Sequence, residues 1–486
     1  MKITKFDEPE LQFGTSCHID IRFGIMNYCP LDFDSATAPK DIKVGIVGSA
    51  ASIEGVRTWL NRCRNEIPAK ASRQPNLFPR FPGFNSDTAF HSEVLLDTLL
   101  EREISPARME EVKRNGVRDV LLVDAVAAFV EGVSYLQERK PADVIICAVP
   151  DVILEALDPE EPDAGPSEEP EDGEHKGTSK LNFHHLLKAR CMGVQRACPI
   201  QIVLPATYDP TKRRIGRSRR LALKPLQDEA TRAWNLHTAL YYKAGGTPWR
   251  LKDDPSKLQT CFVGVGFFRT LDRERMFTAM AQVFNERGKG VVVRGGPAMI
   301  SQEDKQPHLD AGGAYDVMML ALHKFEEEHF TRPARVVVHK TSIHSQAEID
   351  GFRKAITEYR VHSCDLLSMD KSFTRLFRKG EYPPLRGTFL SLDEKSHILY
   401  TRGSVDFYAT YPGLYMPRSL HMGCDRIEQT PSYLAGEVLA LTKMNWNDTQ
   451  FDGGVPITIR AAQQVGNILK YVNKDSPVQA HYSFYM

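Results

Sequence analysis

The residues best suited to chemistry in this sequence are cations and amides that could hold a phosphate group. In NFHHLLKARCMG (182–193), apolar residues recur at helical spacing and form one face. His184 and Lys188 are four residues apart, so they share a different, more exposed face. Gln201 opens the strand-like run QIVLP. From these residues alone, a solvated helix face beside a strand is the simpler interpretation.

A second cation stands at the end of another helical segment, TRAWNLHTALYYKAGGTPWRL (231–251). Gly245 and Gly246 are a natural left-handed stop for this helix, and Pro248 follows just beyond them. Lys243 therefore falls in the last helical turn, where the helix dipole favours a positive charge. The dipole alone would account for Lys243 structurally.

Between these segments runs TKRRIGRSRRLALK (211–224), which contains no acid. A basic run is usually a solvated surface, but this one lies between two other cation-bearing segments, which favours contact with phosphate. The residues that we assign to nucleic-acid backbone contact are Lys212, Arg213, Arg214, Arg217, Arg219 and Arg220.

The stretch CFVGVGFFR (261–269) carries Gly264 and Gly266 inside a buried strand pattern. A nucleotide-binding loop would need a third glycine and a following helix, whereas Phe267 and Phe268 continue the strand. The stretch VGIVGS (44–49) likewise lacks the Lys-Ser/Thr pair of a P-loop. Both patterns argue against a nucleotide-hydrolysing enzyme.

The elements that would position these residues form two groups. In the first half, strand-like runs at 42–48, 143–149 and 199–205 alternate with helical patterns, the longest over 93–138, which predicts a Rossmann-like α/β unit. In the second half, strands at 260–268, 290–295, 334–341, 387–394 and 397–403 accompany helices at 315–328, 431–443 and 459–472. This order predicts an RNase H-like mixed sheet.

Composition sets outer bounds on function. The chain has 486 residues with 42% hydrophobic content and zero formal net charge, so bulk charge gives no argument for nucleic-acid binding. Nine cysteines without a CxxC pair favour a reduced compartment, and no apolar run reaches membrane-spanning length. We expect a cytoplasmic protein. Residues 158–177 are rich in Pro, Glu and Asp, which predicts a disordered acidic insertion.

Taken together, Lys188, Gln201 and YYKAGGTPW (241–249) resemble the MID domain of Argonaute proteins. More narrowly, the whole chain resembles the short prokaryotic Argonautes, which consist of MID and PIWI domains only. The opening DIRFG (20–24) is similar to the way those chains begin. The resemblance implies a lead segment at 1–40 packing on the body, a MID domain at 41–256 and a PIWI domain at 257–486.

In that family the MID pocket captures the phosphorylated 5′ end of a guide strand. The resemblance implies that His184 packs near the first guide base, and that Lys188, Gln201 and Lys243 bind the 5′ phosphate together with Mg²⁺. It also implies that the α-carboxylate of Met486 lies near the pocket as a ligand of the metal, since the apolar tail HYSFYM suits a buried terminus.

Active PIWI domains hold two metal ions with a set of carboxylates. Gly266 stands where the family has its first Asp, and Thr341 stands where it has the second. Near the expected fourth ligand we find Arg460 and Gln463, and Glu303 is a weak candidate for the glutamate of a mobile loop. Relocated acids are the alternative, with candidates Asp350, Asp406, Asp425 and Asp452. We predict a PIWI domain that binds a duplex without cutting.

The resulting hypothesis is a guide-directed sensor of a prokaryotic defence system against invading plasmids and viruses. A short guide RNA would pair with target single-stranded DNA, and recognition would activate a partner subunit with an APAZ domain and a sirtuin-like or TIR NAD-degrading domain. The resemblance implies a heterodimer that assembles further on target binding. The rival hypotheses are an active guide-dependent DNA endonuclease and a structural nucleic-acid-binding protein without a guide.

Overall fold

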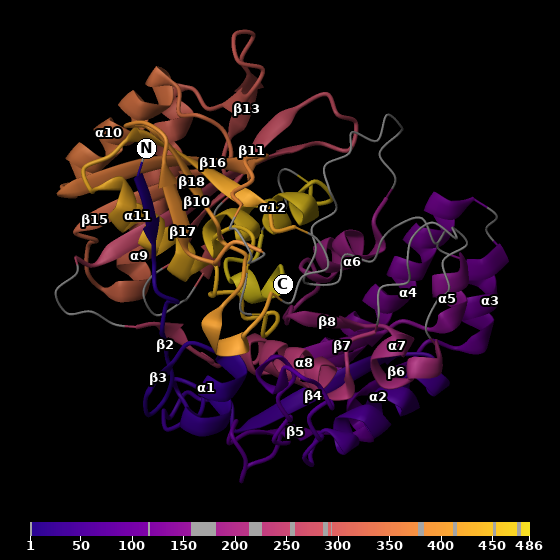
Figure 1. Cartoon of the computed structure of the whole chain (residues 1–486). Helices are drawn as coiled ribbons and strands as arrows, with labels where there is room; N and C mark the ends of the chain where they lie inside the picture. The colour runs from indigo at the N-terminus through magenta and orange to yellow at the C-terminus, as the bar shows by residue number, and fades with distance from the viewer. Residues whose placement is uncertain are drawn as a thin grey trace.

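The structure is a computed structural model that describes residues 2–114, 117–156, 181–212, 226–252, 258–284, 290–292, 294–377, 383–411, 416–450, 453–473 and 478–486. Two sheet-centred bodies lie side by side (Figure 1), one built from the first half of the chain and the other from the second half together with the N-terminal strand. Helices cover the faces of both sheets. The predicted α/β fold class, a Rossmann-like body followed by an RNase H-like body, is confirmed.

The first body has a parallel five-stranded sheet in the order β5-β4-β7-β8, with β6 also paired to β4. Its strands are β4 (Asp41–Gly48), β5 (Glu93–Leu95), β6 (Glu101–Glu103), β7 (Val144–Ala148) and β8 (Ile200–Val203). Its helices are α2 (Ala50–Arg62), α3 (Pro106–Arg114), α4 (Arg118–Arg139), α5 (Asp151–Ala156), α6 (Phe183–Cys191), α7 (Pro205–Tyr208) and α8 (Glu229–Lys243).

One prediction for this body is wrong in part. The helical segment expected over 93–138 begins only at Pro106 and consists of α3 and α4, whereas residues 93–95 and 101–103 form the two short strands β5 and β6. Both strands form backbone hydrogen bonds with β4. This pairing outweighs the helical periodicity of the apolar residues in the local sequence.

The second body has an eleven-stranded sheet among the described residues, in the order β1-β17-β18-β19-β16-β15-β10-β11-β13-β14, with β12 paired to β11. Its strands are β1 (Lys2–Lys5), β10 (Thr260–Arg269), β11 (Met276–Phe284), β12 (Gly290–Val292), β13 (Pro297–Ile300), β14 (Pro307–His308), β15 (Arg335–Lys340), β16 (Ser363–Ser372), β17 (Thr388–Ser391), β18 (Ser396–Leu399) and β19 (Ser419–Arg426). The central strands β10, β15 and β16 run parallel, and the outer strands are antiparallel.

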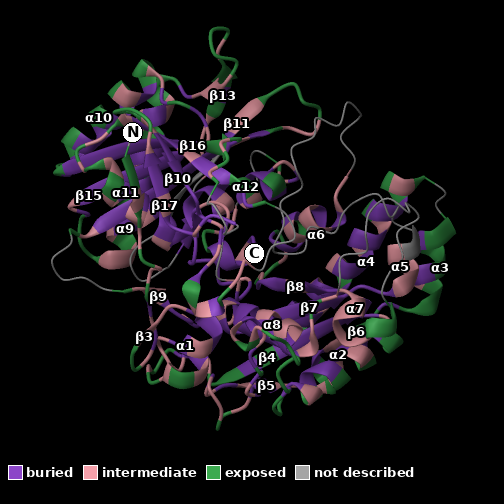
Figure 2. Cartoon of the chain, in the orientation of Figure 1, coloured by how far each residue is buried: buried purple, intermediate pink, exposed green. Residues whose placement is uncertain are grey.

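Helices cover both faces of this central sheet. The helices are α9 (Ala311–His329), α10 (Gln346–Tyr359), α11 (Pro431–Leu441) and α12 (Ile457–Leu469). Alternate strand residues serve opposite faces: Val336 and Val338 pack into the α9–α10 cluster, whereas Val337 packs into the cluster of α11 and α12. The central strands β10 and β15 are therefore buried along almost their whole length, while exposed residues gather on the outer helices, the loops and the outer strands β1 and β13 (Figure 2).

Helix α12 lies directly on two glycines of β10. A Cβ at Gly264 would come within 2.1 Å of the carbonyl oxygen of Thr458, so no side chain fits there without moving the helix backbone. A Cβ at Gly266 would meet the Cβ of Ala462 at 3.3 Å, which a small adjustment relieves. The first glycine is thus required for packing, and the second is not.

The N-terminal lead segment ties the two bodies together. Strand β1 pairs with β17, and the short strand β2 (Leu11–Gln12) pairs with β3 (Cys17–His18) and with β9 (Arg250–Leu251). Between them, the carboxylate of Glu8 accepts from Arg386 and Lys443 at 2.9 Å each, in a buried site. Asp20 caps helix α1 (Ile21–Tyr28) and accepts from Tyr408. None of the described helices has the length and apolarity needed to cross a bilayer.

We predict that alanine substitutions at the two glycines will change the free energy of unfolding by different amounts. Gly264→Ala should lower the free energy of unfolding by about 1–3 kcal/mol, because the added methyl group overlaps a helix carbonyl. Gly266→Ala should be nearly neutral. Apparent melting temperatures of the two variants, measured side by side, test this; equal shifts would contradict the close approach of α12 to β10.

Candidate functional site

Helix α6 presents Lys188 at the boundary of the two bodies. The side chain of Asn182 caps the helix by accepting from the His185 backbone N–H at 3.0 Å, and its own backbone N–H donates to the Tyr471 hydroxyl at 2.9 Å. Tyr471 follows α12, so this bond fixes the start of α6 to the second body. Lys188 is half-buried, and its Nζ lies 3.5 Å from the carbonyl oxygen of Tyr485.

Helix α8 delivers Lys243 to the same region. The chain leaves α8 through Gly245, whose φ of 99° favours glycine. Asp32 secures this turn by accepting from the Tyr241 hydroxyl at 2.6 Å and from the Thr247 backbone N–H at 2.8 Å. The segment YYKAGGTPW therefore has a structural role, which is to place the last helical residue precisely.

Lys243 and Gln201 are in direct contact. The Lys243 ammonium group, only 4% exposed, donates to Gln201 Oε1 at 2.6 Å and to the Ile200 carbonyl at 3.0 Å. Gln201 lies on β8, the edge strand of the five-stranded sheet, which faces α6. The structure thus brings together Lys188, Gln201 and Lys243, which are far apart in the sequence.

Both lysines are electrostatically unsatisfied. Burial lowers the pKa of Lys188 to about 8. Burial, and then the charge of Lys188, hold the pKa of Lys243 well below its ordinary value. Within the described part of the chain neither ammonium group forms an ion pair, since their partners are carbonyl and amide oxygens. Two desolvated cations close together disfavour the charged state until an anion arrives.

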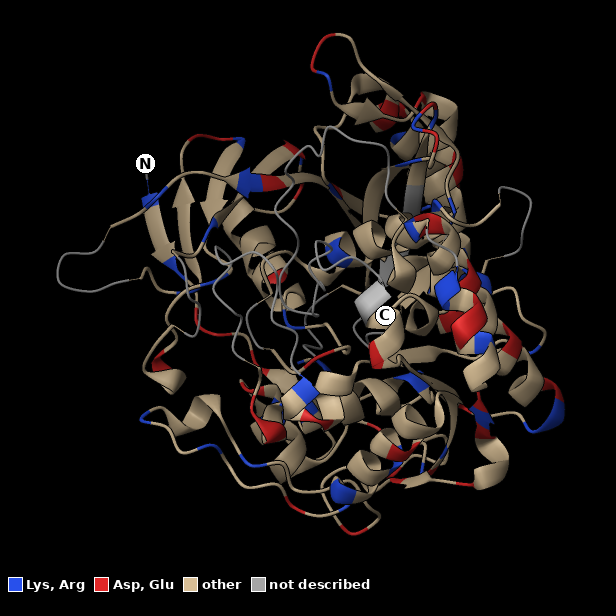
Figure 3. Ribbon diagram, turned by 90° about the vertical axis from the view of Figure 1, so that its right-hand side faces the viewer, with Lys and Arg blue, Asp and Glu red and all other residues tan. Residues whose placement is uncertain are grey.

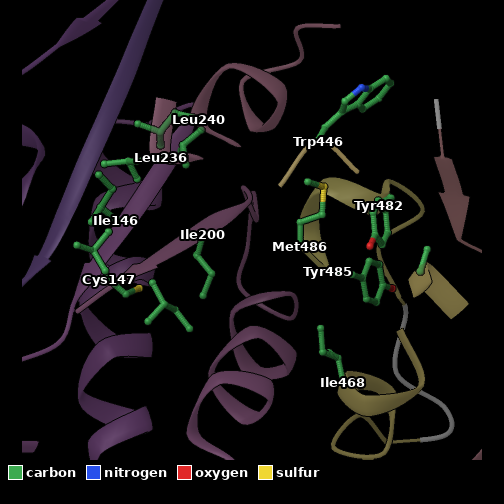
Figure 4. Close-up of a cluster of buried hydrophobic side chains, with 14 of the residues drawn as sticks. Ile146, Cys147, Ile200, Leu236, Leu240, Trp446, Ile468, Tyr482, Tyr485 and Met486 are labelled. Carbon is green, nitrogen blue, oxygen red and sulfur yellow. The ribbon is translucent and has the colours of Figure 1, made fainter. Parts of the chain in front are cut away.

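The end of the chain lies against this pair. Tyr485 and Met486 are buried, and the Tyr485 hydroxyl donates to the Gln479 carbonyl at 2.9 Å. Figure 4 shows Tyr482, Tyr485 and Met486 on one side of the core and Ile146, Cys147 and Ile200 on the other. Because the Lys188 Nζ lies 3.5 Å from the Tyr485 carbonyl oxygen, Met486 directly follows a residue that approaches Lys188.

Two histidines of α6 add to the site. His184 is half-buried beside the ring of Phe183, with ring centroids 6.4 Å apart. His185, which the sequence did not single out, has a pKa lowered to about 3 by burial and then by Lys470 and Lys188. Its Nδ1 is buried without a hydrogen-bond partner among the described residues. His185 and Lys470 come close together only because α12 packs near α6. No local sequence pattern predicts this contact.

Of the basic run at 211–224, the structure describes only the first two residues. Lys212 donates to Asp151 Oδ2 at 2.5 Å, at the start of α5. Arg213, Arg214, Arg217, Arg219 and Arg220 lie outside the described residues, as do the acidic insertion at 158–177 and Asp452. In Figure 3 both signs of charge are interspersed over the view, in keeping with the zero net charge.

The second body places Gly266 and Thr341 at one edge of the sheet. The parallel pairing of β10 with β15 runs to Val265 opposite Lys340, so Gly266 and Thr341 are the next residues on the two neighbouring strands; β15 ends at Lys340, whereas β10 continues to Arg269. Neither supplies a carboxylate. Of the other predicted positions, Gln463 is exposed on α12, Arg460 is half-buried there, and Glu303 is exposed in the turn between β13 and β14.

The candidate relocated acids within the described residues each accept from, or pair with, a neighbouring side chain. Asp350 accepts from Gln346, Asp406 pairs with Lys5, and Asp425 accepts from His344 Nδ1 at 2.6 Å. Asp425 also accepts from Ser368, on the α9–α10 side of the sheet. Within the described ranges, no three His, Cys, Asp or Glu side chains are placed to hold a metal ion.

No family model and no curated protein matches the sequence. The fold, however, is similar to solved Argonaute structures. Clostridium butyricum Argonaute bound to a guide DNA and a 19-mer target DNA matches with a TM-score of 0.65 at 13% identity, over 98% of this chain and 53% of its own. Drosophila Piwi matches with a TM-score of 0.58 at 14% identity, over 99% of this chain and 56% of its own.

A. aeolicus Argonaute gives a similar match, with a TM-score of 0.57 at 14% identity, over 98% of this chain and 54% of its own. The chain spans about half the length of the solved structures that it matches. Its fold is Argonaute-like over nearly the whole chain, with a MID-like body followed by an RNase H-like PIWI body.

Proposed function

We propose that this chain binds the 5′-phosphorylated end of a short guide strand at the lysine pair and presents the guide for pairing with a target strand. The observation that carries the proposal is that Lys188 and Lys243 are desolvated, close together and without an ionic partner among the described residues. A terminal phosphate has nearly two negative charges and three acceptor oxygens, which suits two ammonium groups.

The residues of the proposed pocket would contact different parts of the guide end. Lys188 and Lys243 neutralise the phosphate. Gln201 fixes the Lys243 ammonium group through its Oε1, and because its Nε2 already donates to the Ile202 carbonyl at 3.2 Å, it offers one remaining amide N–H. His184 lies one helical turn before Lys188 on α6, where its ring can pack on the first guide base. A guide that enters this pocket is held only by its 5′ end. The rest of the guide strand therefore remains available to recognise the target sequence by base pairing.

Mg²⁺ fits this pocket only together with the phosphate. The two lysines repel a cation, and Lys243 already occupies Gln201 Oε1. The α-carboxylate of Met486 remains as a protein oxygen ligand, and one carboxylate with phosphate oxygens and water is a donor set that Mg²⁺ accepts. The ion would strengthen the attachment of the phosphate to the buried chain terminus.

The fold supports the nucleic-acid part of the proposal, since one similar solved structure is an Argonaute with guide and target DNA bound. The finer parts follow from the resemblance to short prokaryotic Argonautes: an RNA guide, a single-stranded DNA target, a role in defence, and an APAZ-bearing partner with a sirtuin-like or TIR domain that degrades NAD. Gly266 and Thr341 support recognition without cleavage, because neither can bind a metal as a carboxylate does.

We expect binding to depend on the 5′ phosphate. A 5′-phosphorylated strand should bind more tightly than the same strand with a 5′ hydroxyl, and Lys188→Ala combined with Lys243→Ala should remove that difference. Hydrogen bonds to charged groups contribute about 1.5–3 kcal/mol each, so the loss should be roughly 100-fold or more. Fluorescence anisotropy with both strands measures it, with Lys395→Ala, an exposed lysine in the turn between β17 and β18, as control.

An unchanged preference for the 5′ phosphate in the double variant would overturn the pocket assignment. If the wild-type protein binds both strands equally, the proposal of an end-capturing pocket fails as well, and a guide-free structural nucleic-acid-binding protein becomes the better description.

We expect no cleavage by the guide-loaded protein. Complementary single-stranded DNA incubated with Mg²⁺ or Mn²⁺ should remain intact on a denaturing gel, because the strand ends at Gly266 and Thr341 supply no carboxylate. The Lys188→Ala, Lys243→Ala variant is the matched control, since any cutting that it retains comes from a contaminant. Cleavage opposite the middle of the guide, absent from this control, would establish the alternative function of a guide-dependent DNA endonuclease.

A further inference from the structure

A short aromatic segment projects from the end of β16. Residues 373–377 read FTRLF, and their exposure alternates: Phe373, Arg375 and Phe377 are exposed, whereas Thr374 and Leu376 are half-buried. This period of two is that of an extended chain with one outward face. The two phenylalanine side chains are 81% and 84% exposed, so a large apolar area faces solvent.

The segment is held firmly by its inward residues. The Leu376 backbone N–H donates to the Tyr400 hydroxyl at 2.7 Å, and that hydroxyl donates to the Thr374 carbonyl at 3.2 Å. Ser419 on β19 donates to the same carbonyl at 3.1 Å. Leu376 packs on the buried cluster of Leu390, Ile398 and Tyr400. The outward rings are therefore displayed from an anchored backbone.

Cationic groups accompany the rings. Arg375 stands between the two phenylalanines, and its guanidinium donates to the carbonyls of Ser372 and Thr374 at 3.4 and 3.2 Å. Arg418 is exposed just before β19, whose first residue Ser419 pairs with Ser372. The nearby acid is Asp370, whose carboxylate accepts from His421 at 2.9 Å. The outward surface thus combines aromatic rings with positive charge.

Residues 373–377 lie at the same edge of the sheet as Gly266 and Thr341. Strand β16 runs parallel to β15 and β10, with Ser368 opposite Lys340, and it continues four residues further to Ser372. The segment therefore emerges at the edge of the sheet where Gly266 and Thr341 stand. Phe330, which is 92% exposed and precedes β15, lies at the opposite edge.

We propose that residues 373–377 bind single-stranded nucleic acid outside the phosphate pocket. Bases stack on Phe373 and Phe377, and Arg375 contacts the phosphates between them. In an extended chain the two rings are about 13 Å apart, which leaves room for bases on each ring and backbone between them. The interleaved cation favours this occupant over an apolar protein surface, because burying Arg375 against such a surface would require an acidic partner. This contact goes beyond the proposed function and can fail while that function stands.

The test uses the full chain and a fluorescent 5′-hydroxyl oligo(dT) strand about 20 nucleotides long, which does not engage the phosphate pocket. Phe373→Leu with Phe377→Leu keeps apolar side chains but removes the stacking faces, and it should weaken binding on the order of 30-fold for two lost stacks. Phe373→Trp with Phe377→Trp should bind at least as tightly as the wild type. Phe330→Leu, at the opposite edge, should bind unchanged.

Photocrosslinking gives a second, independent readout. A strand carrying 5-iododeoxyuridine should crosslink to Phe373 or Phe377, located by peptide mass spectrometry. Equal affinity of the wild type and the double leucine variant, or crosslinks only elsewhere, would overturn the proposal. So would a loss of self-association in the leucine variant with strand binding unchanged, because the occupant would then be a second copy of this chain. In every variant, the preference for a 5′ phosphate reports separately on the lysine pocket.

Discussion

The structure depends most on how two lysine ammonium groups are held close together away from water. Lys188 comes from α6 and Lys243 from the end of α8, and each is bound to neutral oxygens among the described residues. Desolvation disfavours the charged form of both groups in the free protein and lowers the pKa of each, and the charge of Lys188 lowers the pKa of Lys243 further. An anionic ligand would stabilise such a site, which is why we propose that the unfavourable burial of the two lysines in the free protein gives selectivity for phosphate.

Helix α12 joins this pocket to the central sheet. Near its beginning, the backbone at Thr458 lies on Gly264 of β10, and just beyond its end the Tyr471 hydroxyl holds the first turn of α6. The chain then folds back so that Tyr485 and Met486 are buried beside Lys188. A single helix thus contacts the strand that carries Gly266 and the helix that carries Lys188, and the pocket is complete only when both bodies are packed together.

Much of this could be predicted from the sequence because the signals were local. The strands β4, β7, β10 and β15 are continuous apolar runs, and Gly245 and Gly246 predict the end of helix α8 just after Lys243. What was missed depends on tertiary contacts. Strands β16 and β19 carry polar residues such as Asp365, which accepts from the buried Arg335, so their pattern is not apolar. His185 and the outward face of 373–377 likewise become visible only when distant elements pack against them.

The most direct test of the lysine pair is a count of the protons taken up when a 5′-phosphorylated strand binds near pH 8, by calorimetry in buffers of different ionisation enthalpy. At that pH the phosphate is already doubly ionised, since its second pKa is about 6. The pKa of Lys188 is about 8 in the free protein, so an anion that raises it must draw protons onto the lysines. We predict net proton uptake that disappears with a 5′-hydroxyl strand and in the Lys188→Ala, Lys243→Ala variant. Phosphate-dependent binding without proton uptake would contradict the account.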